Sequence, residues 1–392
     1  MKICFVSKYP PIEGYVSSYA YWLIRALGER GHTIHVVTNA SEVDPQYKEV
    51  IDRKDTAYTP KGVILHTTAE DRTLGCIPIF NPFTEKLASL TLDIIQSEDI
   101  SLIDSWYLIP YSVAAFTVSL ISGHPFVART AGTDIERMCR SPQFKTLASS
   151  LFKHCSTVIG NVRAVAAVFS QYASKTLQPG VILNTDYFNS RAKSLDLKGS
   201  PKYEEEIPVI TYVGKAVSKK GFYKLTGVLS RICEPFLFLV VSDGGEFTAF
   251  KKHVKELDME DRTLFLNFQP PWKMPSIYRT STVVVSLEHG ELIGRAPFIP
   301  REAAACGCCT LISPEIHSKW YYRMLENGVH TVVADPENPK VLLEAVSNLI
   351  RSPEKAESIG MNGHHFFSRL DNPRNYQQYI DKTVELYQKL SE

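Results

Sequence analysis

Lysines stand at both ends of a short loop in the stretch TYVGKAVSKKG, residues 211–221. Gly214 follows an apolar run, Lys215 and Lys220 bracket the loop, and Gly221 opens a helical pattern. Ammonium groups beside the amino terminus of a helix suit a phosphate or diphosphate, because the helix N–H groups and dipole also favour anions. A solvated basic loop is the alternative interpretation, and the residues alone leave it open.

A carboxylate of interest lies in the stretch GELIGRAPFIPREAAACG, residues 290–307. Pro300 suits the first turn of a helix, Glu302 falls just inside it, and Gly307 is a stop signal. Glu302 could accept hydrogen bonds from sugar hydroxyls, since a carboxylate accepts at both oxygens. It could equally complement the helix dipole, and both readings stay open here.

Three further positions could belong to a site or only to turns. Gly14 and Tyr15, in the turn IEGY, would let the backbone approach a ligand or form a tight turn. Asp134, in AGTDIERM, is either a helix cap or a polar site residue. We find no HExxH, Walker or hydrolase-elbow motif.

Alternating strand and helix patterns predict the elements that position these residues. The pattern occurs in both halves of the chain, which predicts an α/β protein with two Rossmann-like doubly wound domains facing across a cleft. A helix over residues 19–27 is capped by Ser17 or Ser18 and ended by Gly31. The predicted strands cover residues 3–7, 33–38, 63–68, 101–106, 125–130, 156–161, 207–214, 236–242, 262–267, 281–287, 309–313 and 330–335.

A polar segment broken by Gly and Pro separates the two patterns. We assign residues 1–190 to an N-terminal domain, 191–208 to a linker, and 209–375 to a C-terminal domain. Residues 376–392 form a terminal amphipathic helix, for which packing back on the N-terminal domain is considered.

Composition narrows the class of protein. The 392 residues are 44% hydrophobic and 22% charged, with a net charge of +1, which is typical of a globular protein without a nucleic-acid partner. The apolar run of residues 3–6 is too short for a signal peptide, and no run reaches the length of a membrane span. The eight cysteines lack zinc spacing, so we expect free thiols in a reducing cytoplasm and no metal or cofactor.

Four stretches together resemble one known family. KYPPIEGYVSSYAYWLIRALGERGHTIHVVT resembles the amino-terminal motif of the family-4 retaining glycosyltransferases with the GT-B fold. YVGKAVSKKG is similar to their diphosphate loop, APFIPREAAACG to their donor-site helix, and ILNTDYF to the segment that closes their first domain. The resemblance covers nearly the whole chain, in the right order.

The resemblance implies a role for each matching residue. Lys215 and Lys220 stand where basic residues contact the donor diphosphate, Glu302 where a glutamate holds the ribose, and Gly14 at the first glycine of the amino-terminal pair. The implied donor-binding residues are Gly14, Gly214, Gly294, Arg295, Ala296, Phe298 and Ile299. Those assigned to the acceptor side of the cleft are Tyr15, Thr130 and Asp134.

The chain departs from the family pattern on the sugar side. Gly294 stands where the first glutamate of the family's Glu, seven residues, Glu motif is expected, and Glu291 is three residues out of register. Tyr15 replaces the second glycine of the pair, and the histidine expected before Gly132 is missing. We therefore expect Glu291 or backbone groups of the loop to contact the sugar.

The resemblance implies transfer of a sugar from a nucleotide sugar to an acceptor, with retention at the anomeric carbon. Lys215, Lys220, Glu302 and Glu291 form the expected catalytic set, with the lysines stabilising the leaving diphosphate without a metal. The alternatives are a non-catalytic GT-B homologue acting as a binding or partner subunit, and a sugar-nucleotide hydrolase or epimerase. The acceptor is left open among a saccharide, a lipid-linked sugar and a natural product. Peripheral contact of the protein with the inner face of the membrane is also left open.

Overall fold

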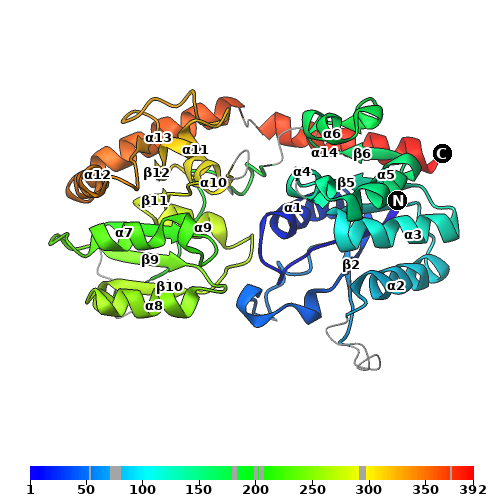
Figure 1. Ribbon diagram of the computed structural model, residues 1–392, viewed down its shortest axis with the longest axis horizontal. Coiled ribbons are helices and arrows are strands. Elements are labelled where there is room, and N and C mark those ends of the chain that lie inside the picture. Colours follow the sequence, from blue (N-terminus) through cyan, green and yellow to red (C-terminus); the bar gives the residue numbers. More distant parts are fainter. Residues whose placement is uncertain are drawn as a thin grey trace. The chain divides into compact units, whose positions relative to one another are not determined.

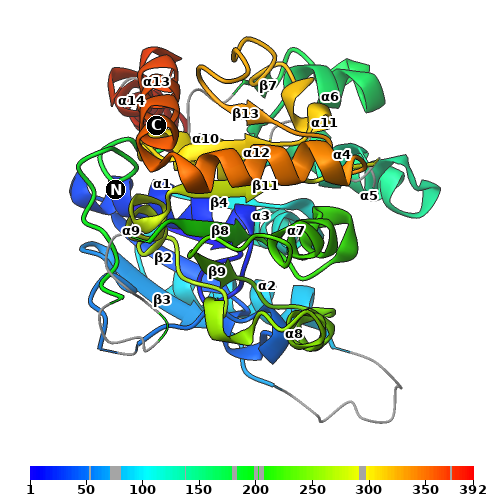
Figure 2. The same ribbon diagram turned by 90° about the vertical axis from the view of Figure 1, so that its left-hand side faces the viewer.

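The chain forms two compact units, which we describe one at a time. The computed structural model describes residues 1–52, 54–70, 81–136, 138–178, 183–197, 202, 207–290, 297–370 and 373–392. Unit 1 comprises Met1–Ile182 together with Arg374–Glu392, and unit 2 comprises Leu183–Pro373 (Figures 1 and 2).

Unit 1 contains a parallel sheet in the order β3-β2-β1-β4-β5-β6-β7. Helices cover both faces, which explains why the inner strands are almost continuously apolar. The strands are β1 (Lys2–Ser7), β2 (Thr33–Thr38), β3 (Val63–Thr67), β4 (Leu102–Trp106), β5 (Phe126–Arg129), β6 (Thr157–Ile159) and β7 (Thr176–Leu177). The helices are α1 (Tyr15–Glu29), α2 (Phe83–Ser97), α3 (Val113–Ser122), α4 (Thr133–Glu136), α5 (Pro142–His154), α6 (Val162–Val168) and α14 (Pro373–Ser391). Short helical turns cover Ala40–Glu42, Pro45–Tyr47, Leu108–Ser112, Met138–Arg140 and Ser170–Tyr172.

Helix α1 starts earlier than its sequence pattern predicts. Gly14 precedes it with φ 114° and ψ 170°, a conformation that strongly favours glycine, and no side chain caps the helix. Ser17 and Ser18 lie inside the first turn, so the predicted serine cap is wrong. The reason is that the backbone turn at Gly14 already starts the helix, with its carbonyl accepting the Ser18 N–H at 3.0 Å.

Helix α14 belongs to unit 1 although it lies at the other end of the sequence. It packs beside α1, where the Tyr376 hydroxyl donates to the Trp22 carbonyl at 3.1 Å. On the exposed side of the same contact, Arg30 pairs with Asp381 at 2.8 Å.

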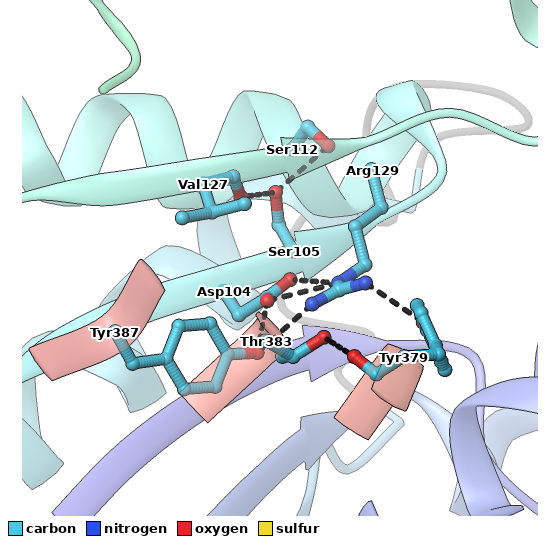
Figure 3. Close-up of polar contacts among 8 residues, drawn as sticks. All are labelled: Asp104, Ser105, Ser112, Val127, Arg129, Tyr379, Thr383 and Tyr387. Carbon is cyan, nitrogen blue, oxygen red and sulfur yellow. Dashed lines mark hydrogen bonds and ion pairs between the residues drawn. The ribbon is translucent and has the colours of Figure 1, made fainter. Parts of the chain in front are cut away.

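Arg129 and Asp104 form a buried ion pair in the sheet of unit 1, and two tyrosines of α14 form hydrogen bonds with it. The Arg129 Nε donates to both carboxylate oxygens of Asp104 at 2.9 Å, and its other nitrogens donate to the hydroxyls of Tyr379 and Tyr387 at 3.0 Å (Figure 3). The Tyr387 hydroxyl in turn donates to Asp104. Burial raises the pKa of the Asp104 carboxyl, and Arg129 and these hydrogen bonds oppose that rise.

Unit 2 contains a second parallel sheet in the order β10-β9-β8-β11-β12-β13. Each unit is thus the doubly wound α/β structure that the sequence predicts. The strands are β8 (Val209–Val213), β9 (Leu237–Val241), β10 (Thr263–Leu266), β11 (Val283–Ser286), β12 (Cys309–Ile312) and β13 (Val332–Val333). The helices are α7 (Phe222–Leu229), α8 (Phe247–Glu256), α9 (Met274–Thr280), α10 (Ile299–Ala305), α11 (Pro314–His317), α12 (Pro339–Arg351) and α13 (Pro353–Leu370). Short helical turns cover Ser218–Lys220 and Glu260–Arg262.

The described part of the segment 191–208 belongs to unit 2 and packs beside α9. The Leu195 N–H donates to the Thr280 hydroxyl at 2.7 Å, and Leu197 is buried in the apolar cluster that contains Ile277. The role of the whole segment as a linker stays a prediction. In the part of the chain that the structure describes, no helix is both long and apolar enough to cross a membrane.

Candidate donor site

Strand β8 is the switch point of the sheet in unit 2, where successive strands stop being added on one side and begin to be added on the other. This strand lies between β9 and β11, and the chain leaves it first toward β9 and later returns on the other side as β11. In open α/β sheets, ligands bind beyond the carboxyl ends of the strands at such a switch point. The loops that follow β8 and β11 are therefore the first place to look for a site.

Lys220 lies at this switch point. Its side chain crosses over Gly214, so that a Cβ on Gly214 would lie 3.2 Å from the Lys220 Cδ and 3.6 Å from its Nζ. The ammonium group forms an ion pair with the carboxylate of Glu288, which follows β11. The glycine that the sequence places at the end of the strand thus makes room for the lysine.

The loop that carries Lys220 is fastened to the end of β11. Gly221 has φ 78°, and a Cβ there would lie 2.5 Å from the Leu287 Cβ. The His289 N–H donates to the Lys219 carbonyl at 3.2 Å. Any larger residue at Gly221 would push the two segments apart, so this glycine sets how closely the lysine approaches Glu288.

Lys215 begins the same loop and is half-buried. Its carbonyl accepts the Tyr212 hydroxyl at 3.2 Å and the Val217 N–H at 2.9 Å. The next residue, Ala216, is tied to the end of β9 by a bond of 2.8 Å from its N–H to the Asp243 carbonyl. The loop that carries both lysines is therefore bonded to the residues after β9 at its beginning and to those after β11 at its end.

Glu302 lies in the first turn of α10, as its sequence context predicts. The residue is 8% exposed, and its Oε2 accepts the hydroxyl of buried Tyr278, from α9, at 2.8 Å. Burial raises the pKa of the Tyr278 phenol, and the Glu302 charge adds to the rise. Phe298 and Ile299 open this helix, with Pro300 in its first turn.

Arg301 and Tyr322 are two neighbours that the sequence interpretation missed. Arg301 is 2% exposed, and its guanidinium carbon lies 4.6 Å from the ring centroid of Tyr321 and 5.9 Å from that of Phe298. The Tyr322 hydroxyl donates to the carbonyl of Pro297. The run Trp-Tyr-Tyr at residues 320–322 was the available signal, since aromatic rings often stack on arginine.

Tyr322 is buried among charged groups. Burial raises the pKa of its phenol, and the charges of Arg301, Glu302 and Glu288 all act on it as well. The Glu302 and Glu288 charges add to this rise, and Arg301 opposes it.

Some predicted residues lie outside the part of the chain that the structure describes. These are Glu291, Gly294, Arg295 and Ala296. Contact between Glu291 and the sugar therefore stays a prediction. Two described carboxylates do contact the loop of residues 215–220: Glu288 pairs with Lys220, and Glu246 accepts the Ser218 N–H at 3.1 Å.

The candidate residues of unit 1 also follow a switch point, since β1 lies between β2 and β4. A Cβ on Gly14 would meet no atom within 4 Å, so only its backbone conformation calls for glycine. The Tyr15 ring packs against Tyr19 at 4.7 Å and edge-on to Trp106 at 6.4 Å between centroids. The tyrosine that replaces a glycine is thus anchored by aromatic neighbours.

Asp134 organises two loops at the carboxyl edge of the same sheet. Its buried carboxylate accepts the N–H groups of Ala131 at 3.0 Å and Leu108 at 3.4 Å. Burial raises its pKa to about 6, against the opposing effect of these hydrogen bonds. Thr130 lies beside Gly160, where a Cβ would come within 2.0 Å of the threonine hydroxyl. The bonds from the Ala131 and Leu108 N–H groups to Asp134 are those of a residue that orders loops, as in the helix-cap interpretation of the sequence.

Among the described residues, no group of three or more His, Cys, Asp or Glu side chains is arranged to hold a metal ion. The cysteines of the described segments are free thiols, and Cys306, Cys308 and Cys309 are all buried. Burial raises the pKa of the Cys309 thiol to about 12, so this group stays protonated and unreactive at neutral pH.

Comparison with known proteins agrees with this geometry. Residues 195–366 match the family described as Glycosyl transferases group 1. The chain is 23% identical over 293 residues to N-acetyl-alpha-D-glucosaminyl L-malate synthase of Bacillus anthracis, covering 72% of this chain and 71% of that protein. It is 25% identical over 233 residues to spore coat protein SA of Bacillus subtilis, covering 55% of this chain and 59% of the relative.

Solved structures show the same fold. Sucrose-phosphate synthase from Thermosynechococcus elongatus superposes with a TM-score of 0.67 at 17% identity, covering 99% of this chain and 98% of that one. Anabaena Alr3699/HepE, solved in complex with UDP-glucose, gives 0.64 at 18% identity, covering 98% and 99%.

Two doubly wound α/β units, which superpose on these structures over nearly the whole chain, define a protein of the GT-B fold class. Residues 195–366 match the glycosyl transferases group 1, and the chain has the GT-B fold of the family-4 retaining glycosyltransferases. The family and fold expected from the sequence are confirmed.

Proposed function

We propose that the protein transfers a hexosyl group from a nucleoside diphosphate sugar to an acceptor hydroxyl, with Lys215 and Lys220 binding the diphosphate. The observation that carries this proposal is the position of Lys220, held over Gly214 at the switch point of unit 2. A ligand at this edge meets two ammonium groups on one short loop, and a diphosphate is the part of a nucleotide sugar that matches them.

The same lysines supply the main catalytic effect in this proposal. Negative charge develops on the leaving diphosphate as the bond to the sugar breaks, and preorganised cations are often the largest catalytic contribution. Retention then follows from attack on the same face, with the leaving phosphate taking the proton of the acceptor hydroxyl. The proposal calls for no metal ion, because the lysines do the corresponding work.

Glu302 is the proposed partner of the ribose. Its Oε2 already accepts the Tyr278 hydroxyl, but a carboxylate has about four acceptor positions, which leaves capacity for ribose hydroxyls. The Phe298 N–H, just before α10, is a proposed backbone donor to the ligand. Arg295, Ala296 and Glu291 remain in the proposal as sugar-side or diphosphate contacts on the evidence of the sequence.

The acceptor is proposed to bind at the carboxyl edge of the sheet in unit 1. Gly14 and Tyr15 follow β1 there, and Thr130 follows β5. Residues 1–190 would thus form the acceptor domain and 209–375 the donor domain. We place the reaction in the cytoplasm, since the buried cysteines are free thiols and a reducing compartment preserves them.

A panel of nucleotide sugars tests the proposal. UDP-glucose comes first, because the Anabaena relative was solved with it. Thermal shift is measured for the wild type and for Lys220→Ala, followed by release of the nucleoside diphosphate with and without a mixture of candidate acceptors. We expect at least one donor to stabilise the wild type but not the variant, and its turnover to require an acceptor. Stabilisation of both proteins alike would refute the lysine assignment, and turnover without acceptor would favour a hydrolase.

A further inference from the structure

A short two-stranded ribbon lies beside the start of α1. It consists of residues 11–13, which follow β1, and residues 47–49, and we call these two segments the ribbon. An antiparallel bridge between Ile12 and the exposed Lys48 joins them. Because the chain passes directly from the ribbon into α1, the ribbon bears on where that helix starts.

The ribbon supports the turn at Gly14 on its N-terminal side. Gly14 has φ 114°, no side chain caps the helix that follows, and a Cβ on Gly14 would meet no atom within 4 Å. The residue before it, Glu13, donates its N–H to the Tyr47 carbonyl at 3.0 Å. The turn is therefore attached to the rest of unit 1 on this side by the backbone of the ribbon.

Two carboxyl groups are buried on one face of the ribbon. Glu13 and Glu49 each follow a residue of the bridged pair, and side chains alternate between the two faces of a strand, so both lie on the face opposite the bridged pair. The Glu49 N–H donates to the Pro11 carbonyl at 2.8 Å, which fixes this end of the ribbon. Glu13 is 7% exposed and Glu49 is 5% exposed.

The Glu49 carboxyl lacks the partners that a buried charge requires. Within the described parts of the chain, its Oε2 has no hydrogen-bond partner. Burial raises the pKa of this carboxyl well above its ordinary value, and the Glu13 charge adds to the rise. Burying an unpaired charge costs far more than burying a neutral carboxyl group. The neutral acid is therefore the form of Glu49 that fits the closed ribbon.

Tyrosines and an arginine pack around the carboxyl pair. Burial raises the pKa of the Tyr58 phenol and the Glu49 charge adds to that rise, which places Tyr58 close to Glu49. The Tyr58 carbonyl accepts the hydroxyl of the buried Tyr9 at 3.0 Å. Burial likewise raises the pKa of Tyr9, and Arg25 of α1 opposes that rise. The charge that acts on Glu49 is the negative one of Glu13, and it favours the protonated form.

We propose that Glu49 is a positioning residue for the Gly14 turn. As a neutral acid it lies against Glu13 and closes the ribbon, whereas as a carboxylate it is repelled by Glu13 and favours an open ribbon. The bearing of this switch on catalysis rests on the acceptor role proposed for Gly14 and Tyr15. The switch itself needs neither donor nor acceptor, so its test succeeds or fails independently of the proposed function.

Hydrogen exchange of the full chain, measured by mass spectrometry from about pH 5 to pH 9, tests the proposal. Protection is taken as the ratio of intrinsic to observed exchange rates, which removes the ordinary pH dependence of exchange. The closed ribbon binds the Glu49 proton more tightly than the open one. Protection of residues 12–18 and 47–49 should therefore fall as pH rises, by up to about ten-fold per pH unit, until Glu49 ionises in the closed ribbon. Protection of α2 should change much less.

Three variants make the test specific. Glu49→Gln replaces the acid by a neutral side chain of the same size, so the ribbon should stay protected across this pH range. Glu13→Gln removes the repelling charge, so the fall in protection should end at a lower pH, because Glu49 ionises more easily. Glu85→Gln, at an exposed position of α2, is the matched control and should keep the wild-type profile.

Equal pH profiles for the wild type and Glu49→Gln would overturn the proposal. Lower protection of the ribbon in Glu49→Gln at about pH 5 would do the same, since it would mean that the ionised carboxylate holds the ribbon. A loss of protection that spreads equally to α2 would assign Glu49 to global stability instead of to the Gly14 turn. The wild-type profile and Glu13→Gln keep the test decisive if Glu49→Gln does not fold.

Discussion

Replacing Glu288 by glutamine should strengthen the binding of a nucleoside diphosphate. Without ligand, the Glu288 carboxylate neutralises the Lys220 ammonium. A diphosphate that binds Lys220 must share or displace this partner, so part of the binding free energy is spent on breaking the ion pair. The glutamine keeps the size of the side chain and removes the competing charge.

The size of the effect follows from the burial of the pair. The side chains of Lys220 and Glu288 are 24% and 14% exposed, so the pair is better shielded than a typical surface pair but still hydrated. Surface pairs contribute about 0–1 kcal/mol, and we place this one near the upper end, at about 1 kcal/mol. The affinity of Glu288→Gln for UDP should therefore rise by about five-fold.

Isothermal titration calorimetry with UDP measures this change, and two comparisons make it specific. Glu337→Gln is the matched control, because Glu337 pairs with Lys224 at 2.9 Å in the same unit but is far more exposed, so affinity should not change. Lys220→Ala should lose about ten-fold to a hundred-fold in affinity, and adding Glu288→Gln to it should have no further effect. Weaker binding by Glu288→Gln alone would refute competition and make Glu288 a residue that positions the lysine.

Three other predictions concern single side chains. If the Glu302 carboxylate holds the ribose, Glu302→Gln should weaken donor binding with little loss of stability. If it only complements the helix dipole, the change should cost about 0.3–1 kcal/mol of stability and leave donor affinity unchanged. Melting curves and binding curves measured on the same variant distinguish the two roles. Tyr387→Phe should destabilise the protein by about 1–3 kcal/mol in urea unfolding, because the buried Arg129 ion pair loses a hydrogen-bond partner, and unchanged stability would contradict the structure. Asp134, with a pKa raised to about 6 in the folded protein, binds a proton more tightly there than in the unfolded chain, so its contribution to stability should fall by up to about 3 kcal/mol as pH rises from 4 to 7. Asp134→Asn should remove that part of the pH dependence, and identical pH profiles for the two proteins would disprove it.

Local patterns were sufficient to predict much of the fold and the places of several candidate residues within it. The strand predicted at residues 33–38 is β2 with the same bounds, because a buried parallel strand shows as a short apolar run. The places of Gly214, Lys220 and Glu302 could be predicted for a similar reason, since each lies next to a strand end or a helix start that the local sequence marks, and their roles in donor binding stay predictions.

Contacts between distant segments could not be predicted in this way. Glu288 meets Lys220 because β8 and β11 are neighbours in the sheet, 68 residues apart in sequence. Counting residues backward from Glu302 assumes a fixed loop length and cannot find such a pair. The tyrosines of α14 are a second case, since Tyr387 reaches Arg129 across 258 residues.

The return of α14 to unit 1 has a consequence for the order in which the protein forms during synthesis. Unit 2 is one continuous segment, Leu183–Pro373, and all of it leaves the ribosome before α14 does. Unit 1 must wait for Arg374–Glu392, so until then Arg129 and Asp104 lack the hydroxyls of Tyr379 and Tyr387. The nascent N-terminal segment therefore lacks these contacts throughout translation of the second unit, and incomplete apolar packing of this kind favours aggregation.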